Sequence, residues 1–69
     1  MDIFIFRTTI NTDSDIQAIA SEIEKLPGVS RWTVDLDDCD KVLRVVGGEM
    51  AAIREVVEKQ GYMCEELPD

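Results

Sequence analysis

The segment Ile10-Asn11-Thr12-Asp13-Ser14-Asp15 marks the change from the first predicted strand to the first predicted helix. Thr12 suits a helix N-cap, because its hydroxyl can accept a hydrogen bond from the backbone amide of Asp15. Asp13 and Asp15 place negative charge at the positive end of the helix dipole. Thr12-x-x-Asp15 approximates a capping box with Asp in place of Glu. We therefore expect a helix to begin at residue 13.

Apolar periodicity on both sides of this segment predicts further strands and helices. Residues 3–6 are apolar on both faces, and residues 13–26 carry one apolar helical stripe that ends at Pro27-Gly28. Residues 29–36 and 42–46 alternate with a period of two across a polar turn, which predicts an antiparallel hairpin. A second helix over 49–60, ended by Gly61, and a last strand over 62–66 complete the chain.

This β-α-β-β-α-β order predicts a ferredoxin-like α+β sandwich in one domain that spans residues 1–69. Right-handed crossovers give an antiparallel sheet in the order 4-1-3-2, with both helices on one face. The opposite face of the sheet should therefore remain uncovered.

Composition restricts the function. The net charge is −8 and the pI is about 4.3, so neither a phosphate backbone nor an anionic membrane is an expected partner. No long apolar run or basic leader is present, which favours a cytoplasmic protein. The chain has no histidine, no activated nucleophile and no phosphate loop. Arg7 and Asn11 lack the loop that small acylphosphate hydrolases use to hold an anion, so we expect no enzymatic activity.

Three short motifs carry a family resemblance. Leu26-Pro27-Gly28-Val29 closes the first helix, Val34-Asp35-Leu36 lies in the second strand, and Gly61-Tyr62 opens the fourth. Together, in this order, they resemble the heavy-metal-associated domain, a family of copper chaperones and soluble domains of metal-pumping ATPases. The resemblance covers nearly the whole chain.

The resemblance implies a metal loop that this chain has lost. Family members carry M-x-C-x-x-C between the first strand and first helix, and counting back from residues 26–28 places Ile10, Thr12 and Asp15 on the Met and the two Cys. Linear Cu(I) sites need soft thiolates, whereas a hydroxyl and a carboxylate are hard ligands. We therefore expect neither a thiolate copper site nor a cofactor, and we interpret Thr12 and Asp15 as helix caps.

Two other metal sites remain open as alternatives. The first is an acidic pole at the end of the sheet where a hard cation such as Ca²⁺ or Mg²⁺ would bind. Its members are Asp13, Asp15, Asp37, Asp38 and Asp40. We favour the simpler interpretation, in which they form a solvated acidic rim. The second alternative is a site formed by cysteines from two chains.

The two cysteines are not expected to meet within one chain. Cys39 and Cys64 fall on opposite edges of the predicted sheet, about 14 Å apart, and a disulfide needs Cα atoms within about 7 Å. Cys64 should be a small core residue and Cys39 an exposed thiol.

The uncovered sheet face supplies the leading functional hypothesis. If Ile3 and Ile5 point toward the helices, a hydrophobic patch lies on the other side of the sheet and marks a contact surface. Its predicted members are Phe4, Phe6, Val42, Val46 and Met63. The opposite facing of the first strand would exchange the two faces and weaken this argument, and long Arg and Glu side chains could instead cover the patch in a monomer.

The sequence thus predicts a small non-enzymatic protein-interaction module. Its partner would be another protein, or a second copy packed sheet to sheet. Trp32 should face the first helix as part of the core, although an edge Trp can also anchor a partner. The competing hypothesis is a metal carrier that uses the acidic pole or intermolecular cysteines.

Overall fold

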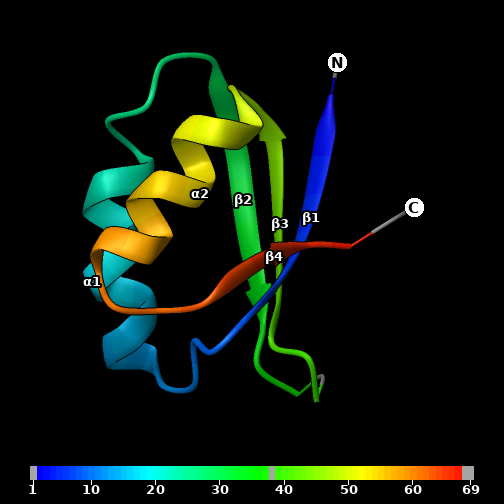
Figure 1. Ribbon diagram of the computed structural model, residues 1–69. Coiled ribbons are helices and arrows are strands. Elements are labelled where there is room, and N and C mark those ends of the chain that lie inside the picture. Colours follow the sequence, from blue (N-terminus) through cyan, green and yellow to red (C-terminus); the bar gives the residue numbers. More distant parts are fainter. Residues whose placement is uncertain (1, 38, 68–69) are drawn as a thin grey trace.

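The computed structural model describes residues 2–37 and 39–67, and its elements follow the predicted order. They are β1 (Ile3–Thr8), α1 (Asp13–Ile23), β2 (Val29–Asp35), β3 (Val42–Gly47), α2 (Met50–Lys59) and β4 (Cys64–Glu66). The strands pair antiparallel in the order β2-β3-β1-β4, which confirms the predicted sheet. Figure 1 shows both helices against one face of this sheet. The fold is the expected ferredoxin-like sandwich.

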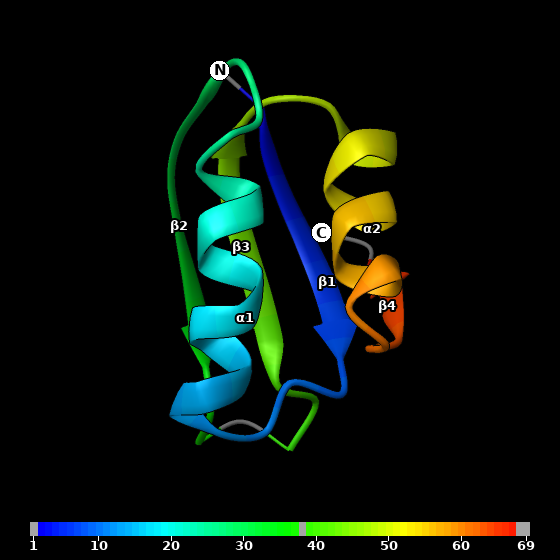
Figure 2. The same cartoon turned by 90° about the vertical axis from the view of Figure 1, so that its left-hand side faces the viewer.

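The two helices divide the covered face between them. Figure 2, which looks through the helices toward the sheet, shows α1 over the β2–β3 side and α2 toward the β1–β4 side. The core lies between these layers and consists of fully or almost fully buried side chains from every element except β2. They are Phe6, Ile10, Ile19, Ile23, Leu43, Val45, Ile53, Val57 and Cys64. Within the described residues no helix is long and apolar enough to cross a membrane.

The first helix ends earlier than its apolar stripe predicts. The N–H groups of Lys25 and Leu26 donate to the carbonyls three residues back, so the chain tightens into a turn after Ile23. Pro27 explains this difference, because a proline disfavours the α conformation in the residue before it. Leu26 still packs against the core from the turn.

The predicted facing of the first strand is wrong. Phe6 is fully buried and Phe4 packs against the core, whereas Ile3 is 58% exposed. The register sets this facing, because Phe4 lies opposite Val45 and Phe6 opposite Leu43, the two β3 residues that point toward the helices. The larger aromatic side chains thus fill the space between the layers, and Phe4 and Phe6 are not part of an exposed contact surface.

Candidate functional site

The loop that precedes α1 is a closed capping box. The Asp15 N–H donates to Thr12 Oγ1 at 3.1 Å, and the Thr12 N–H donates back to Asp15 Oδ2 at 3.1 Å. The Asn11 N–H donates to the same carboxylate oxygen at 3.0 Å. The predicted N-cap is therefore confirmed, and the side chains of Thr12 and Asp15 are both occupied by backbone amides.

Tyr62 adds a contact that the sequence did not reveal. Its hydroxyl donates to Asp15 Oδ1 at 2.7 Å, across 47 residues of chain. This hydrogen bond, followed by those from the backbone, lowers the pKa of the Asp15 carboxyl below its ordinary value of 3.8. The same bond is the main cause that raises the pKa of Tyr62 above 10.0. The segment between α2 and β4 is thus tied to the start of α1.

Threonines at the end of β1 fix the same pole of the molecule. Thr8 is buried, donates to the Lys41 carbonyl at 2.7 Å and accepts from the Ile10 N–H at 3.2 Å. Thr9 accepts from the Met63 N–H at 2.9 Å. Ile10, at the position of the family's methionine, is fully buried. These bonds join the end of β1 and the following loop to the residues just before β3 and β4, so the loop has a structural role.

The acidic pole does not assemble into a cation site in the described part of the chain. No three Asp, Glu or Cys side chains of residues 2–37 and 39–67 come together in a way that could hold an ion. Asp13, Asp37 and Asp40 therefore gain no ligand role from the structure, and Asp15 is engaged as described above. Asp38 lies outside the described residues.

The cysteines occupy the predicted environments. Both are free thiols, with Cys64 buried and Cys39 exposed. Burial raises the pKa of the Cys64 thiol to about 11. Cys64 is therefore a core residue with little thiolate at neutral pH, and Cys39 is an accessible thiol.

The side of the sheet that the helices leave free is called the open face here. Its side chains alternate with the core residues of the strands: Ile3, Ile5 and Arg7 on β1, Arg31, Thr33 and Asp35 on β2, Val42, Arg44 and Val46 on β3, and Glu65 on β4. The register aligns Ile3, Val46 and Arg31 in one row across three strands. This row and its neighbours enclose a shallow groove of about 280 Å³.

The predicted contact residues on β3 and just before β4 differ in solvent exposure. Val46 lines the groove. Val42 faces the open side but is only 4% exposed, in a row with Arg7 and Asp35, so it offers almost no surface to a partner. Met63, just before β4, is 46% exposed.

Trp32 faces the core as predicted, since it lies opposite Val45 and packs against the buried cluster. Its position on edge strand β2 also brings it to the rim of the groove on the open face. It is the chain's single tryptophan, so its fluorescence reports on both environments.

Comparisons with known proteins place the fold beside domains that include a copper transporter domain and a metallochaperone. The N-terminal domain of PacS from Synechocystis PCC6803 superposes with a TM-score of 0.84 at 19% identity, covering 99% of this chain and 100% of that domain. The yeast copper transporter domain Ccc2a, solved in apo and Cu(I)-loaded states, gives 0.81 at 21% identity, covering 97% and 96%. The CopZ metallochaperone gives 0.80 at 18% identity, covering 91% and 98%. No protein-family model matches the chain, and no curated protein matches it.

These superpositions establish the fold, which is the heavy-metal-associated fold expected from the sequence. They do not establish a function for this chain. The donor set of the capping loop does not fit Cu(I), because it offers a hydroxyl and a carboxylate that are hard ligands and already hydrogen-bonded. The loop of this chain stabilises the start of α1 through hydrogen bonds to the side chains of Thr12 and Asp15.

Proposed function

We propose that this chain is a non-enzymatic, cytoplasmic protein-contact module, built on the fold of copper-handling domains, that binds its partner through the open face. The observation that carries the proposal is the apolar surface that Ile3 and Val46 offer at the groove. Ile3 is 58% exposed beside Val46 on a sheet face that no helix covers. The contact surface therefore differs from the predicted one, with Ile3 and Ile5 in place of Phe4 and Phe6.

Exposed aliphatic side chains at the groove are unfavourable in water. Burying an aliphatic side chain of this size fully contributes about 1.5–3 kcal/mol. A partner that covers Ile3, and the half-buried Ile5 and Val46 beside it, would recover part of that amount at each position. Contiguous apolar area on an otherwise charged surface usually marks a contact site.

Protein contact is also consistent with the structural neighbours. A structure of the Atx1–Cu(I)–Ccc2a complex matches the chain with a TM-score of 0.79 at 21% identity, covering 97% of this chain and 96% of that chain. A domain of this fold therefore exists in a protein–protein assembly. We infer that the present chain keeps the capacity for contact without the thiolate loop.

Photo-crosslinking tests the proposal. A benzoylphenylalanine placed at Ile3 should give discrete crosslinked products with one or a few proteins in the cells that express the chain. The same probe at Ala51, exposed on the outer side of α2, is the matched control. Equal products from both positions, or none from position 3, would contradict contact through the open face.

Metal carriage through intermolecular cysteines is the rival function, and one observation favours it. Cys39 is an exposed free thiol, so two copies could present two thiolates to one soft ion. This arrangement predicts a metal-dependent dimer that Cys39→Ser abolishes. Sedimentation of the wild-type chain with and without Cu(I) decides between the two functions.

A further inference from the structure

The Lys and Arg side chains of this acidic protein differ in whether they have a carboxylate partner. The chain has seven Lys and Arg residues against 15 Asp and Glu residues. Within the described part of the chain, Arg7, Lys25, Arg54 and Lys59 each lie within 4.0 Å of a carboxylate. Lys41 donates to the Leu36 carbonyl at 2.8 Å. Acids are in excess, so a nearby carboxylate partner is the normal condition for a base on this surface.

Among residues 2–37 and 39–67, Arg31 and Arg44 are the two cations with neither a carboxylate partner nor a carbonyl partner like that of Lys41. Both are exposed, and neither has a carboxylate partner there. Both also line the same groove on the open face, beside Ile3, Thr33 and Val46. Arg31 thus ends the row that contains Ile3 and Val46, and Arg44 lies in the neighbouring row.

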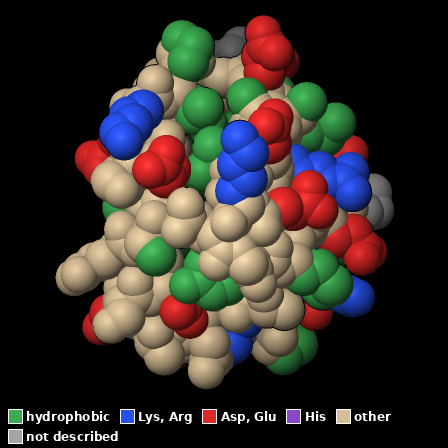
Figure 3. All heavy atoms as spheres, turned by 60° about the vertical axis from the view of Figure 1, so that its left-hand side comes forward, with side chains coloured by type: hydrophobic (Ala, Val, Ile, Leu, Met, Phe, Trp, Pro, Cys, Tyr) green, Lys and Arg blue, Asp and Glu red, His purple; other side chains and the backbone are tan. Residues whose placement is uncertain are grey.

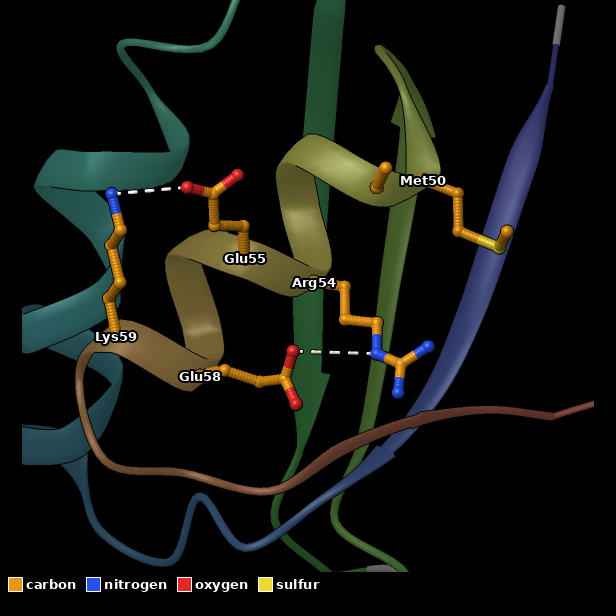
Figure 4. A pocket seen from close by; sticks show the side chains of 6 residues that line it. Met50, Arg54, Glu55, Glu58 and Lys59 are labelled. Atoms are coloured by element: carbon orange, nitrogen blue, oxygen red, sulfur yellow. Dashed lines mark ion pairs between the residues drawn. The ribbon is translucent and has the colours of Figure 1, made fainter.

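The outer side of α2 provides the contrast. A hollow of about 410 Å³ lies there beside Met50 and Ala51. Its charges, however, are already satisfied, because Arg54 pairs with Glu58 at 3.4 Å and Lys59 with Glu55 at 3.1 Å (Figure 4). A charged ligand would have to displace these internal pairs.

The helix side as a whole follows the same pattern as α2. Figure 3, turned so that this side comes forward, shows acidic and basic side chains close together with several hydrophobic patches between them. Such a mixed surface is typical of a solvated face. The groove on the open face instead combines apolar surface with two arginines that have no carboxylate partner among the described residues.

We propose that the groove binds an acidic, strand-like segment of a partner protein, which places carboxylates on Arg31 and Arg44 and an apolar side chain between Ile3 and Val46. An extended segment suits this site because its side chains alternate with a period of two, as the rows of the open face do. Arginine suits it because its planar guanidinium binds a carboxylate with two parallel hydrogen bonds. This inference rests on the proposed contact function and names the chemistry of the partner.

A nucleic acid is a poorer occupant of the groove. Its phosphates form a dense line of negative charge, and the net charge of −8 repels such a line along its length. A short segment with a few carboxylates can bind through attraction to the two nearby arginines alone. Debye screening over about 8–10 Å at ordinary ionic strength limits the repulsion from the rest of the surface.

The experiment uses three short synthetic peptides that alternate Val or Ile with Glu, Gln or Lys. Each is titrated into the full chain, and binding is followed by the fluorescence of Trp32, which lines the groove. The Glu peptide should bind, and its affinity should fall as salt rises from about 50 to about 500 mM. The Gln and Lys peptides should bind at least about tenfold more weakly.

Charge variants assign the site. Arg31→Gln/Arg44→Gln should weaken binding of the Glu peptide about tenfold, while Arg54→Gln, which removes a cation on α2, should leave it unchanged. Equal affinity for all three peptides, an unchanged affinity in the double variant, or no binding of the Glu peptide at millimolar concentration overturns the inference. Thermal unfolding of each variant confirms that it is folded, as expected for exposed positions.

Self-association is measured on the same samples. If the chain sediments at twice 7.8 kDa and Arg31→Glu/Arg44→Glu restores the monomer, the occupant is a second copy and the acidic-partner inference fails. Crosslinks from position 3 separate this failure from a failure of the contact function. If they form while the Glu peptide does not bind, the contact function stands and only the partner's chemistry is wrong.

Discussion

Comparing Phe6→Ala with Ile3→Ala is the most informative perturbation of the fold, because the facing of β1 decides which residues a partner contacts. Phe6 is fully buried in the core cluster. Truncating a buried Phe to Ala costs about 3–5 kcal/mol, the sum of lost transfer free energy and the cavity that remains. Ile3 is 58% exposed. Scaling about 1.5–3 kcal/mol for full burial by its covered fraction predicts a cost of about 1 kcal/mol for Ile3→Ala.

These costs are large relative to the whole stability of the domain. A chain of this size has a free energy of unfolding of about 3–10 kcal/mol. Phe6→Ala should therefore be partly or wholly unfolded. Ile3→Ala should remain folded, with a urea midpoint about 1 M below that of the wild type. Urea titration followed by Trp32 fluorescence measures both, with a slope near 1 kcal/mol per molar urea. A loss at Ile3 equal to or greater than that at Phe6 would refute the facing of β1 and, with it, the open face as defined.

Further predictions concern the capping loop and the thiols. Thr12→Ala should lower the free energy of unfolding by about 1 kcal/mol through loss of the N-cap, and Thr12→Ser should retain it; equal losses would mean that the cap contributes nothing. Because hydrogen bonding lowers the pKa of Asp15 in the folded chain, its contribution is present above the ordinary value and is lost as the pH falls through the lowered one. Tyr62→Phe removes the main cause of this lowered pKa, so the free energy of unfolding should fall less steeply as the pH drops, measured as urea midpoints between about pH 5 and 2. The same loss of stability in the variant and the wild type would show that the bond does not stabilise the folded chain in solution. A thiol reagent at pH 8 should label Cys39 promptly and Cys64 only on unfolding, and prompt labelling of both would contradict the burial of Cys64.

Local sequence patterns were sufficient for most of the fold. Four consecutive residues, Thr12 to Asp15, are enough to predict the capping box, and the period-two alternation of the hairpin correctly predicted Val42 and Val46 on the face away from the helices. Pro27 and Gly28 separated α1 from β2. These features depend on near neighbours in the chain, so one sequence carries them.

The facing of β1 could not be obtained in this way. Residues 3–6 are apolar at every position, so alternation does not distinguish the two faces, and the choice depends on pairing with β3 nearly 40 residues later. One signal was available: a Phe pair on a central strand fills a core better than it tolerates water. Applied to Phe4 and Phe6, it would have predicted the observed facing.

The remaining features of the site are also long-range. The hydrogen bond from Tyr62 to Asp15 joins residues 47 positions apart, and no local pattern indicates it. Likewise, the unpaired state of Arg31 and Arg44 follows from where the acidic side chains lie in space. The sequence shows only that cations are few.

The central claim is that this chain acts by protein contact and not by carrying copper in the loop before α1. Competition for Cu(I) against a colorimetric chelator under reducing, anaerobic conditions tests it most directly. The wild-type chain should leave the metal with the chelator, and Thr12→Cys/Asp15→Cys, which supplies two thiolates, should withdraw it in stoichiometric amount. Withdrawal of Cu(I) by the wild-type chain, in proportion to its concentration, would contradict the account.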